Sequence, residues 1–268
     1  MESVVRNILA LLAACFAFAP LVRAQLVVNL SAKTTAEFES YAANVRRELE
    51  ERWSGKKSLL FIDQDAKARE QVLGGELFIE QMNGGKPAPI SDGLIHDWLG
   101  AIFIPNRTPA QVVHLLEDFD RHKDIYPAVA ESKTVERTGD HVLGRWQLRQ
   151  KGIVPVVLDV DEDVTYQRIG PGKWKGEAYA RRVIEHDTGL FASGRKFPEG
   201  EGHGYLWRLY SYWTFEAVNG GVIAECRTLS LSRDVPPGLN WAVGPYIQKM
   251  PHDSLASTLK QTRDALAK

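Results

Sequence analysis

The sequence predicts an α+β fold in which a curved antiparallel β-sheet wraps around one long C-terminal α-helix. Three observations favour this fold. Apolar and polar residues alternate with a period of two through most of residues 76–232, which is typical of strands with one buried face. An amphipathic helix pattern interrupts the strands after residue 107, and apolar residues recur at helical spacing in residues 251–267.

The chain begins with the pattern of a secretory signal peptide, residues 1–24. An apolar run that ends at Val22 is followed by Ala24, a small residue that suits cleavage before Gln25. We therefore expect export to the periplasm or the outside of the cell. A short motif that ends at Cys15 resembles a lipoprotein box and leaves membrane proximity open, but the apolar run continues past it, which favours ordinary cleavage.

Residues 25–75 are predicted to form a helical N-terminal extension. Phe38, Val45 and Leu49 recur at helical spacing within a helix expected at residues 34–53. Thr34 and Glu37 have the spacing of a capping box at its start. The segment is too short to bury a hydrophobic core alone, so we interpret it as an extension and not as a second domain.

The remaining elements follow in order along residues 76–268. Thr108 and Pro109 suit the start of the inserted helix, and Tyr126-Pro127 ends it, because a residue before proline avoids the helical conformation. Pro251 is expected to start the terminal helix. Strands are expected at residues 76–82, 94–104, 133–138, 141–150, 154–169, 173–186, 205–218 and 222–232.

This order of elements resembles the START-related ligand-binding superfamily, also called SRPBCC or helix-grip proteins. The resemblance rests on Ala101–Arg137, the strands through Arg233, Asp234–Gly244 and Met250–Leu266, and it covers residues 76–268. In that family the sheet and the long helix enclose an apolar cavity that holds lipids, sterols, polyketides or other hydrophobic molecules. Some members are aromatases or cyclases. The resemblance implies a START-like ligand-binding domain here.

The candidate cavity residues come from the alternation of the strands and the spacing of the terminal helix. Simple alternation places Arg182 and His186 on the face of Trp174, where they would form the polar end of the cavity. For any single aromatic residue plain core is the more natural interpretation, and an ordinary ion pair, for example with Glu162, suits Arg182 better than a ligand contact. The predicted ligand-binding residues are Arg182, His186, Trp207, Ser211, Trp213, Leu255 and Leu259.

Other classes of function find little support in the sequence. The formal net charge is −1, without the basic excess that a nucleic-acid binder usually carries. The histidines and cysteines lack zinc-ligand spacing, the alternating acids of residues 159–163 lack the glycine of a calcium loop, and no nucleophile-elbow motif is present. We therefore expect no catalytic residue, metal or cofactor. Cys226 is interpreted as a buried thiol.

The sequence thus predicts an exported binding protein for a hydrophobic or amphipathic small molecule. One alternative is a cyclase-, aromatase- or hydrolase-like enzyme of the same fold that uses Arg182, His186 and tyrosine side chains. Another is an interaction module that binds no ligand and docks a partner through its N-terminal helix. The ligand, the oligomeric state, the role of residues 25–75 and the direction in which Glu225 and Arg227 point are left open.

Overall fold

A nine-stranded antiparallel sheet is the frame of the part of the chain that the structure describes. The computed structural model describes residues 27–151, 155–188, 193–234 and 240–267, without the side chains of residues 240–248. The predicted signal peptide and its cleavage site lie outside these residues. An additional two-stranded pairing joins β1 (Val28–Asn29) to β9 (Glu201–Gly202).

The strands of the large sheet follow the predicted alternation closely. Their order across the sheet is β2 (Phe78–Gln81), β4 (Gly93–Pro105), β11 (Gly221–Arg233), β10 (Arg208–Val218), β8 (Lys173–Glu185), β7 (Val156–Gly170), β6 (His141–Gln150) and β5 (Val129–Thr138). A short strand that the sequence did not predict, β3 (Ala88–Ile90), also pairs with β4. The segment from β5 to β8 is a meander, as expected for strands joined by tight turns.

The helices of the first half are short except for one. They are α2 (Ala32–Trp53), the 3₁₀ turn η1 (Phe61–Gln64), α3 (Ala66–Leu73), α4 (Met82–Gly85), α5 (Pro109–Glu117) and α6 (Phe119–Ile125). The helix predicted after residue 107 is therefore two helices, because Asp118 has a non-helical ψ of 73°. Thr108 and Gln111 form a capping box at the start of α5, and Pro109 occupies its first turn.

The start of α2 differs from the prediction in its capping residue. Ser31 is the N-cap, and its side chain accepts a hydrogen bond from the Thr34 amide at 3.0 Å. Glu37 does not close a capping box. Its carboxylate instead accepts hydrogen bonds from the amide and hydroxyl of Ser91, at 2.7 and 2.9 Å. Glu37 thereby ties α2 to the turn before β4.

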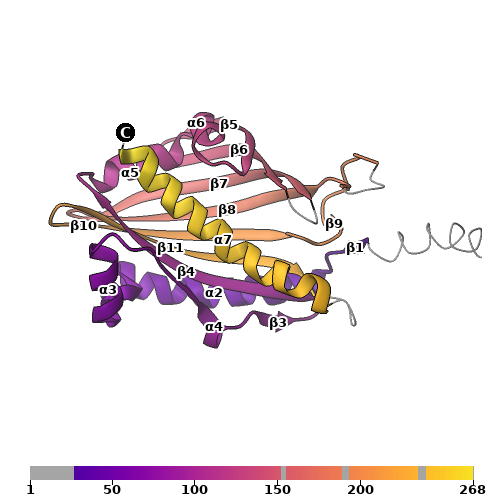
Figure 1. Ribbon diagram of the computed structural model, residues 1–268, viewed down its shortest axis with the longest axis horizontal. Coiled ribbons are helices and arrows are strands. Elements are labelled where there is room, and N and C mark those ends of the chain that lie inside the picture. Colours follow the sequence, from indigo (N-terminus) through magenta and orange to yellow (C-terminus); the bar gives the residue numbers. More distant parts are fainter. Residues whose placement is uncertain (1–26, 152–154, 189–192, 235–239, 268) are drawn as a thin grey trace, which may run out of the picture.

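The long terminal helix α7 (Asn240–Ala267) crosses the sheet diagonally (Figure 1). It begins before Pro251, which the sequence analysis placed at its start, so this proline lies within the helix at the cost of one backbone hydrogen bond. Leu255 and Leu259 face the sheet, 3% and 0% exposed. A Cβ added to Gly100 of β4 would lie 2.6 Å from Leu259 Cδ1, so the absence of a side chain at this position permits the close approach of α7.

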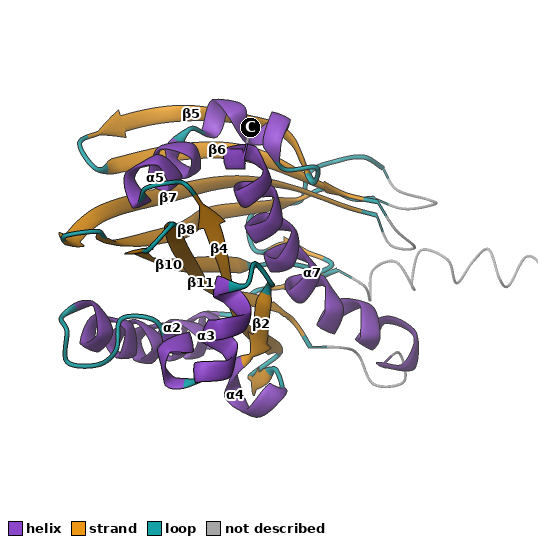
Figure 2. Ribbon diagram, turned by 60° about the vertical axis from the view of Figure 1, so that its left-hand side comes forward, coloured by secondary structure: helices purple, strands orange, loops and turns teal. Residues whose placement is uncertain are grey.

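The sheet lies between two helical layers (Figure 2). We call the face toward α7 the inner face and the face toward α2 the outer face. On the outer face, α2 packs Phe38, Val45 and Leu49 against Tyr212 and Leu229 of the sheet. Residues 27–75 therefore supply a layer that covers part of the outer face. Where the ligand-binding domain itself begins stays a prediction.

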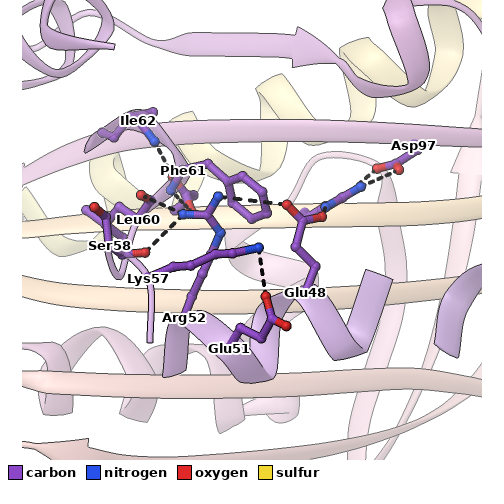
Figure 3. A network of polar contacts seen from close by, with 11 residues as sticks. Glu48, Glu51, Arg52, Lys57, Ser58, Leu60, Phe61, Ile62 and Asp97 are labelled. Atoms are coloured by element: carbon purple, nitrogen blue, oxygen red, sulfur yellow. Dashed lines mark hydrogen bonds and ion pairs between the residues drawn. The ribbon is translucent and has the colours of Figure 1, made fainter. Parts of the chain in front are cut away.

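A polar network crosses the contact between α2 and the outer face (Figure 3). Arg227 of β11 donates to both carboxylate oxygens of Asp97 on β4, at 2.9 and 2.8 Å, and to Glu48 of α2 at 2.8 Å. Glu225 accepts hydrogen bonds from the amides of Phe61 and Ile62. Glu225 and Arg227 therefore point away from α7, which answers the question that the sequence left open.

Candidate functional site

A cavity of about 180 Å³ lies between the inner face of the sheet, α6 and α7. Its walls are mostly apolar and aromatic, and the polar groups among them are few. The lining residues are Leu116, Phe119, His122, Tyr126, Ala128, Val129, Trp146, Leu148, Glu162, Val164, Tyr166, Ala178, Leu209, Ser211, Trp213, Ser254, Ser257 and Thr258. A cavity with apolar walls and a small number of polar groups is the usual form of a small-molecule site.

Glu162 is the acidic residue of the cavity wall. It lies on β7 between Val160 and Val164, where the alternation of the strand turns its side chain to the inner face. Trp146 Nε1 donates to Glu162 Oε2 at 3.0 Å. Burial raises the pKa of the Glu162 carboxyl to about 7, against the smaller opposing effect of that hydrogen bond.

Two residues of α6 and its C-terminus form the polar part of the opposite wall. Tyr126 Oη and Thr262 Oγ1 of α7 are 3.0 Å apart, and burial raises the pKa of Tyr126 to about 12. Burial also lowers the pKa of His122 to about 4, so its imidazole is neutral at physiological pH. Within the described residues, His122 Nε2 is buried and has no hydrogen-bond partner.

The predicted site residues divide into those at the cavity and those elsewhere. Ser211 and Trp213 line it, as the alternation of β10 predicted. Leu255 and Leu259 belong to the adjoining core, where they pack against the sheet. The side of α7 that lines the cavity carries Ser254, Ser257 and Thr258 instead.

Trp207 lies on the other side of the sheet from Trp213, contrary to the prediction. β10 begins only at Arg208, and the chain bends at Trp207, so the alternation does not extend back to this residue. Its ring packs in the cluster that α2 covers, with Tyr212 and Leu231. Trp207 is therefore a core residue of the outer layer and not a wall of the cavity.

Arg182 and His186 also lie on the outer face, and a β-bulge is the reason. Ala180 pairs with Glu162 and Arg182 pairs with Asp161, so Arg181 is an extra residue in β8. From there on the alternation is reversed, because one inserted residue turns each later side chain to the opposite face. Arg182 consequently does not share the face of Trp174 and is 43% exposed.

The outer face near this bulge is held by ion pairs. Arg182 Nη2 lies 2.7 Å from Asp161 Oδ2, and Arg145 pairs with the other oxygen of the same carboxylate at 2.6 Å. His186 Nε2 lies 3.0 Å from Asp159 Oδ2. The partner of Arg182 is thus Asp161 and not Glu162. Arg145 and Arg182 border a surface depression of about 380 Å³ whose walls carry many charged side chains and are open to solvent.

Sequence reasoning named Glu162 only as a possible ion-pair partner of Arg182 and missed Trp146, His122 and Tyr126. A signal for Glu162 was present, since it occupies an inward position of the alternating strand that runs from Val156 to Tyr166. The α6 residues had no such signal, because the break at Asp118 determines which side chains of α6 face the cavity. Among the described residues, no group of three or more potential metal ligands is present. No described helix is long and apolar enough to span a membrane.

A sheet that wraps around a long C-terminal helix, with short helices inserted after β4, is the helix-grip arrangement. The fold is START-like. No family model matches this chain, and no curated protein matches it in sequence. The likeness to solved structures of the helix-grip type is therefore a likeness of fold alone.

Three such structures illustrate the range of helix-grip proteins that this chain resembles. The STAR-related lipid transfer protein of Xanthomonas axonopodis is 17% identical, with a TM-score of 0.45 over 68% of this chain and 98% of that one. Human STARD10 is 12% identical, with a TM-score of 0.42 over 77% of this chain and 80% of that one. The Zhui aromatase/cyclase of a Streptomyces species is 10% identical, with a TM-score of 0.40 over 65% of this chain and 94% of that one.

Proposed function

We propose that this protein is an exported binding protein that holds a hydrophobic or amphipathic small molecule between its sheet and α7. The observation that carries the proposal is the cavity of about 180 Å³ with aromatic and aliphatic walls and a small polar part. Trp213, Tyr166 and Phe119 offer apolar area to a ligand, while Glu162 and Ser211 offer hydrogen bonds.

Filling the cavity is the direct test of this proposal. Ser211 lines the cavity from β10, so Ser211→Trp places an indole in the space that a ligand would take. The protein should bind a hydrophobic reporter dye stoichiometrically, seen as a rise in dye emission, and Ser211→Trp should abolish that binding. Thr138→Trp is the matched control, because it adds the same ring at an exposed position at the end of β5.

The comparison of these variants can also contradict the proposal. An isolated larger side chain costs about 1–3 kcal/mol, which is less than the roughly 5–15 kcal/mol stability of a folded domain. Ser211→Trp should therefore stay folded, as circular dichroism would verify. Equal dye binding by the wild type and by folded Ser211→Trp would mean that the protein has no ligand site in this cavity.

One observation favours an enzyme as the second candidate function. Glu162, whose pKa of about 7 suits a general acid or base, lines the cavity together with Tyr126 and Tyr166. Arg182 and His186, to which the sequence analysis gave catalytic roles, lie on the outer face. A molecule that co-purifies with the protein, identified by native mass spectrometry, would separate the two functions. An enzyme should convert it, and Glu162→Gln should not.

The interaction-module interpretation stays a third candidate, but a partner could not dock on the apolar side of α2. Phe38 and Leu49, on the apolar side of α2, are buried against the outer face of the same chain. Export rests on the sequence of residues 1–24 alone. Intact-mass measurement of protein from cells should give a chain that begins at Gln25, and a diacylated Cys15 would instead place the protein on a membrane.

A further inference from the structure

Among the described residues, the carboxyl group in the cavity has no counter-ion. Glu162 is the only acidic residue among the described lining residues, and none of these is lysine or arginine. His122 contributes no positive charge at neutral pH, because burial lowers its pKa to about 4. The cations nearest along the strands, Arg145 and Arg182, are paired with Asp161 on the outer face.

The groups that face Glu162 from each neighbouring element are neutral. Trp146 of β6 donates one hydrogen bond to Oε2. Tyr126 at the end of α6, Tyr166 of β7 and Cys226 of β11 interact with the carboxyl electrostatically, and burial raises the pKa of each. When Glu162 ionises, the side chains that the structure describes therefore offer it one indole N–H and no cation.

The wall of the cavity near Glu162 suits a positively charged group in a further way. Trp146, Tyr126 and Tyr166 line the same space, and the electron-rich faces of such rings attract ammonium groups. Glu162 is half-buried, and a carboxylate held partly away from water without a counter-ion is costly, so a ligand cation that pairs with it would bind more strongly than a neutral group. A ligand carboxylate would instead be repelled by the ionised Glu162.

We propose that the cavity selects amphipathic amines, with the apolar body between the sheet and α7 and the ammonium group paired with Glu162. This inference rests on the proposed function, because it names the ligand class of the same cavity. It also requires that acidic amphipaths, such as free carboxylic acids, are excluded.

Three probes of nearly equal shape can test the charge preference. They are 1-naphthylmethylamine, 1-naphthylmethanol and 1-naphthoic acid, which present an ammonium, a hydroxyl and a carboxylate on the same ring system. Binding is measured by isothermal titration calorimetry at about pH 8, where Glu162 is ionised and the amine is still charged. The amine should bind at least about tenfold more tightly than the alcohol, and the acid should not bind measurably.

Two variants locate the preference at Glu162. In Glu162→Gln the amide can still accept the hydrogen bond of Trp146, so the alcohol should keep its affinity while the amine loses its advantage. Glu136→Gln is the control, since Glu136 is an exposed carboxylate on β5. Ser257→Lys places a cation at the exposed rim of the cavity on α7 and should weaken the amine and admit the acid.

The outcomes distinguish this inference from the proposed function. If the alcohol binds the wild type as tightly as the amine does, the preference for amines is wrong and the binding function stands. An amine preference that survives Glu162→Gln would also overturn the inference, because the cation would then be held elsewhere. Failure of all three probes, with folded protein, would contradict the binding function itself.

A change of pH gives an independent reading of the same pair. Lowering the pH from about 8 to about 5.5 protonates Glu162 and should weaken amine binding in the wild type but not in Glu162→Gln. A ligand that instead accepts a hydrogen bond from the protonated carboxyl would bind more tightly at the lower pH. Stronger amine binding at about pH 5.5 than at about pH 8 would therefore refute the proposed ion pair.

Discussion

Replacing Glu162 by glutamine should stabilise the protein at alkaline pH and leave its stability almost unchanged at acidic pH. Burial raises the pKa of this carboxyl from 4.5 to about 7 in the folded chain. Between these values the folded chain holds a proton that the unfolded chain has released. The free energy of unfolding of the wild type therefore falls as the pH rises through this window.

The size of the effect follows from the shift in pKa. The rise from 4.5 to about 7, at about 1.36 kcal/mol for each pKa unit, corresponds to about 3 kcal/mol lost by the wild type above neutral pH. Glutamine has no charged form and keeps an oxygen that can accept from Trp146 Nε1, as Glu162 does at 3.0 Å. The variant should escape this loss.

The measurement is urea unfolding of both proteins at several values between about pH 4.5 and about pH 8.5. Glu225 is also buried with a pKa raised to about 7, so the wild-type curve alone mixes two carboxyls. The difference between wild type and Glu162→Gln isolates Glu162, because Glu225 is common to both. A difference that stays constant across this pH range would show that Glu162 keeps an ordinary pKa and is well solvated.

The remaining predictions concern packing and the contact between the sheet and α2. Leu259 is fully buried against the sheet, so Leu259→Ala should cost about 2–5 kcal/mol of unfolding free energy, and a loss below about 0.5 kcal/mol would mean that α7 does not pack there. Gly144→Ala would place a Cβ 2.2 Å from the Phe119 ring, and this clash should lower the free energy of unfolding by about 1–3 kcal/mol. Because Phe119 lines the cavity, dye binding should also change. An unchanged melting temperature would contradict this packing. Asp97→Asn leaves the buried Arg227 without the opposite charge of Asp97, and we expect the free energy of unfolding in urea to fall by about 3–5 kcal/mol. Glu80→Gln, the control at an exposed position of β2, should have almost no effect on it.

The architecture was predictable because its signals are local. Alternation marked the long strands, and the spacing of Leu255 and Leu259 marked the buried side of α7. Each of these patterns depends on residues a few positions apart, and burial of one face is enough to produce it. The position of α2 on the outer face had no comparable signal, because it depends on pairing residues more than a hundred positions apart, such as Glu48 and Arg227.

The candidate site was less predictable because each error arose where alternation stops. Alternation extended back to Trp207, where the chain bends, put that residue on the wrong face. Alternation extended past the bulge at Arg181 did the same for Arg182 and His186. Neither position carries a glycine or proline that would have indicated an irregular strand. The alternation of β7 did place Glu162 inward, but the sequence analysis considered it only as an ion-pair partner of Arg182.

The bulge in β8 determines which charged side chains of this strand face the interior. Because Arg181 is an extra residue, Val183 and Glu185 face inward and Arg182 and His186 face outward. If the same residues continued as a regular strand, an arginine and a histidine would enter the interior on the strand next to Glu162. The charge of the interior is therefore encoded in the number of residues along one strand as well as in their types. A single insertion or deletion here would change which charged side chains face the interior, and no point substitution does the same.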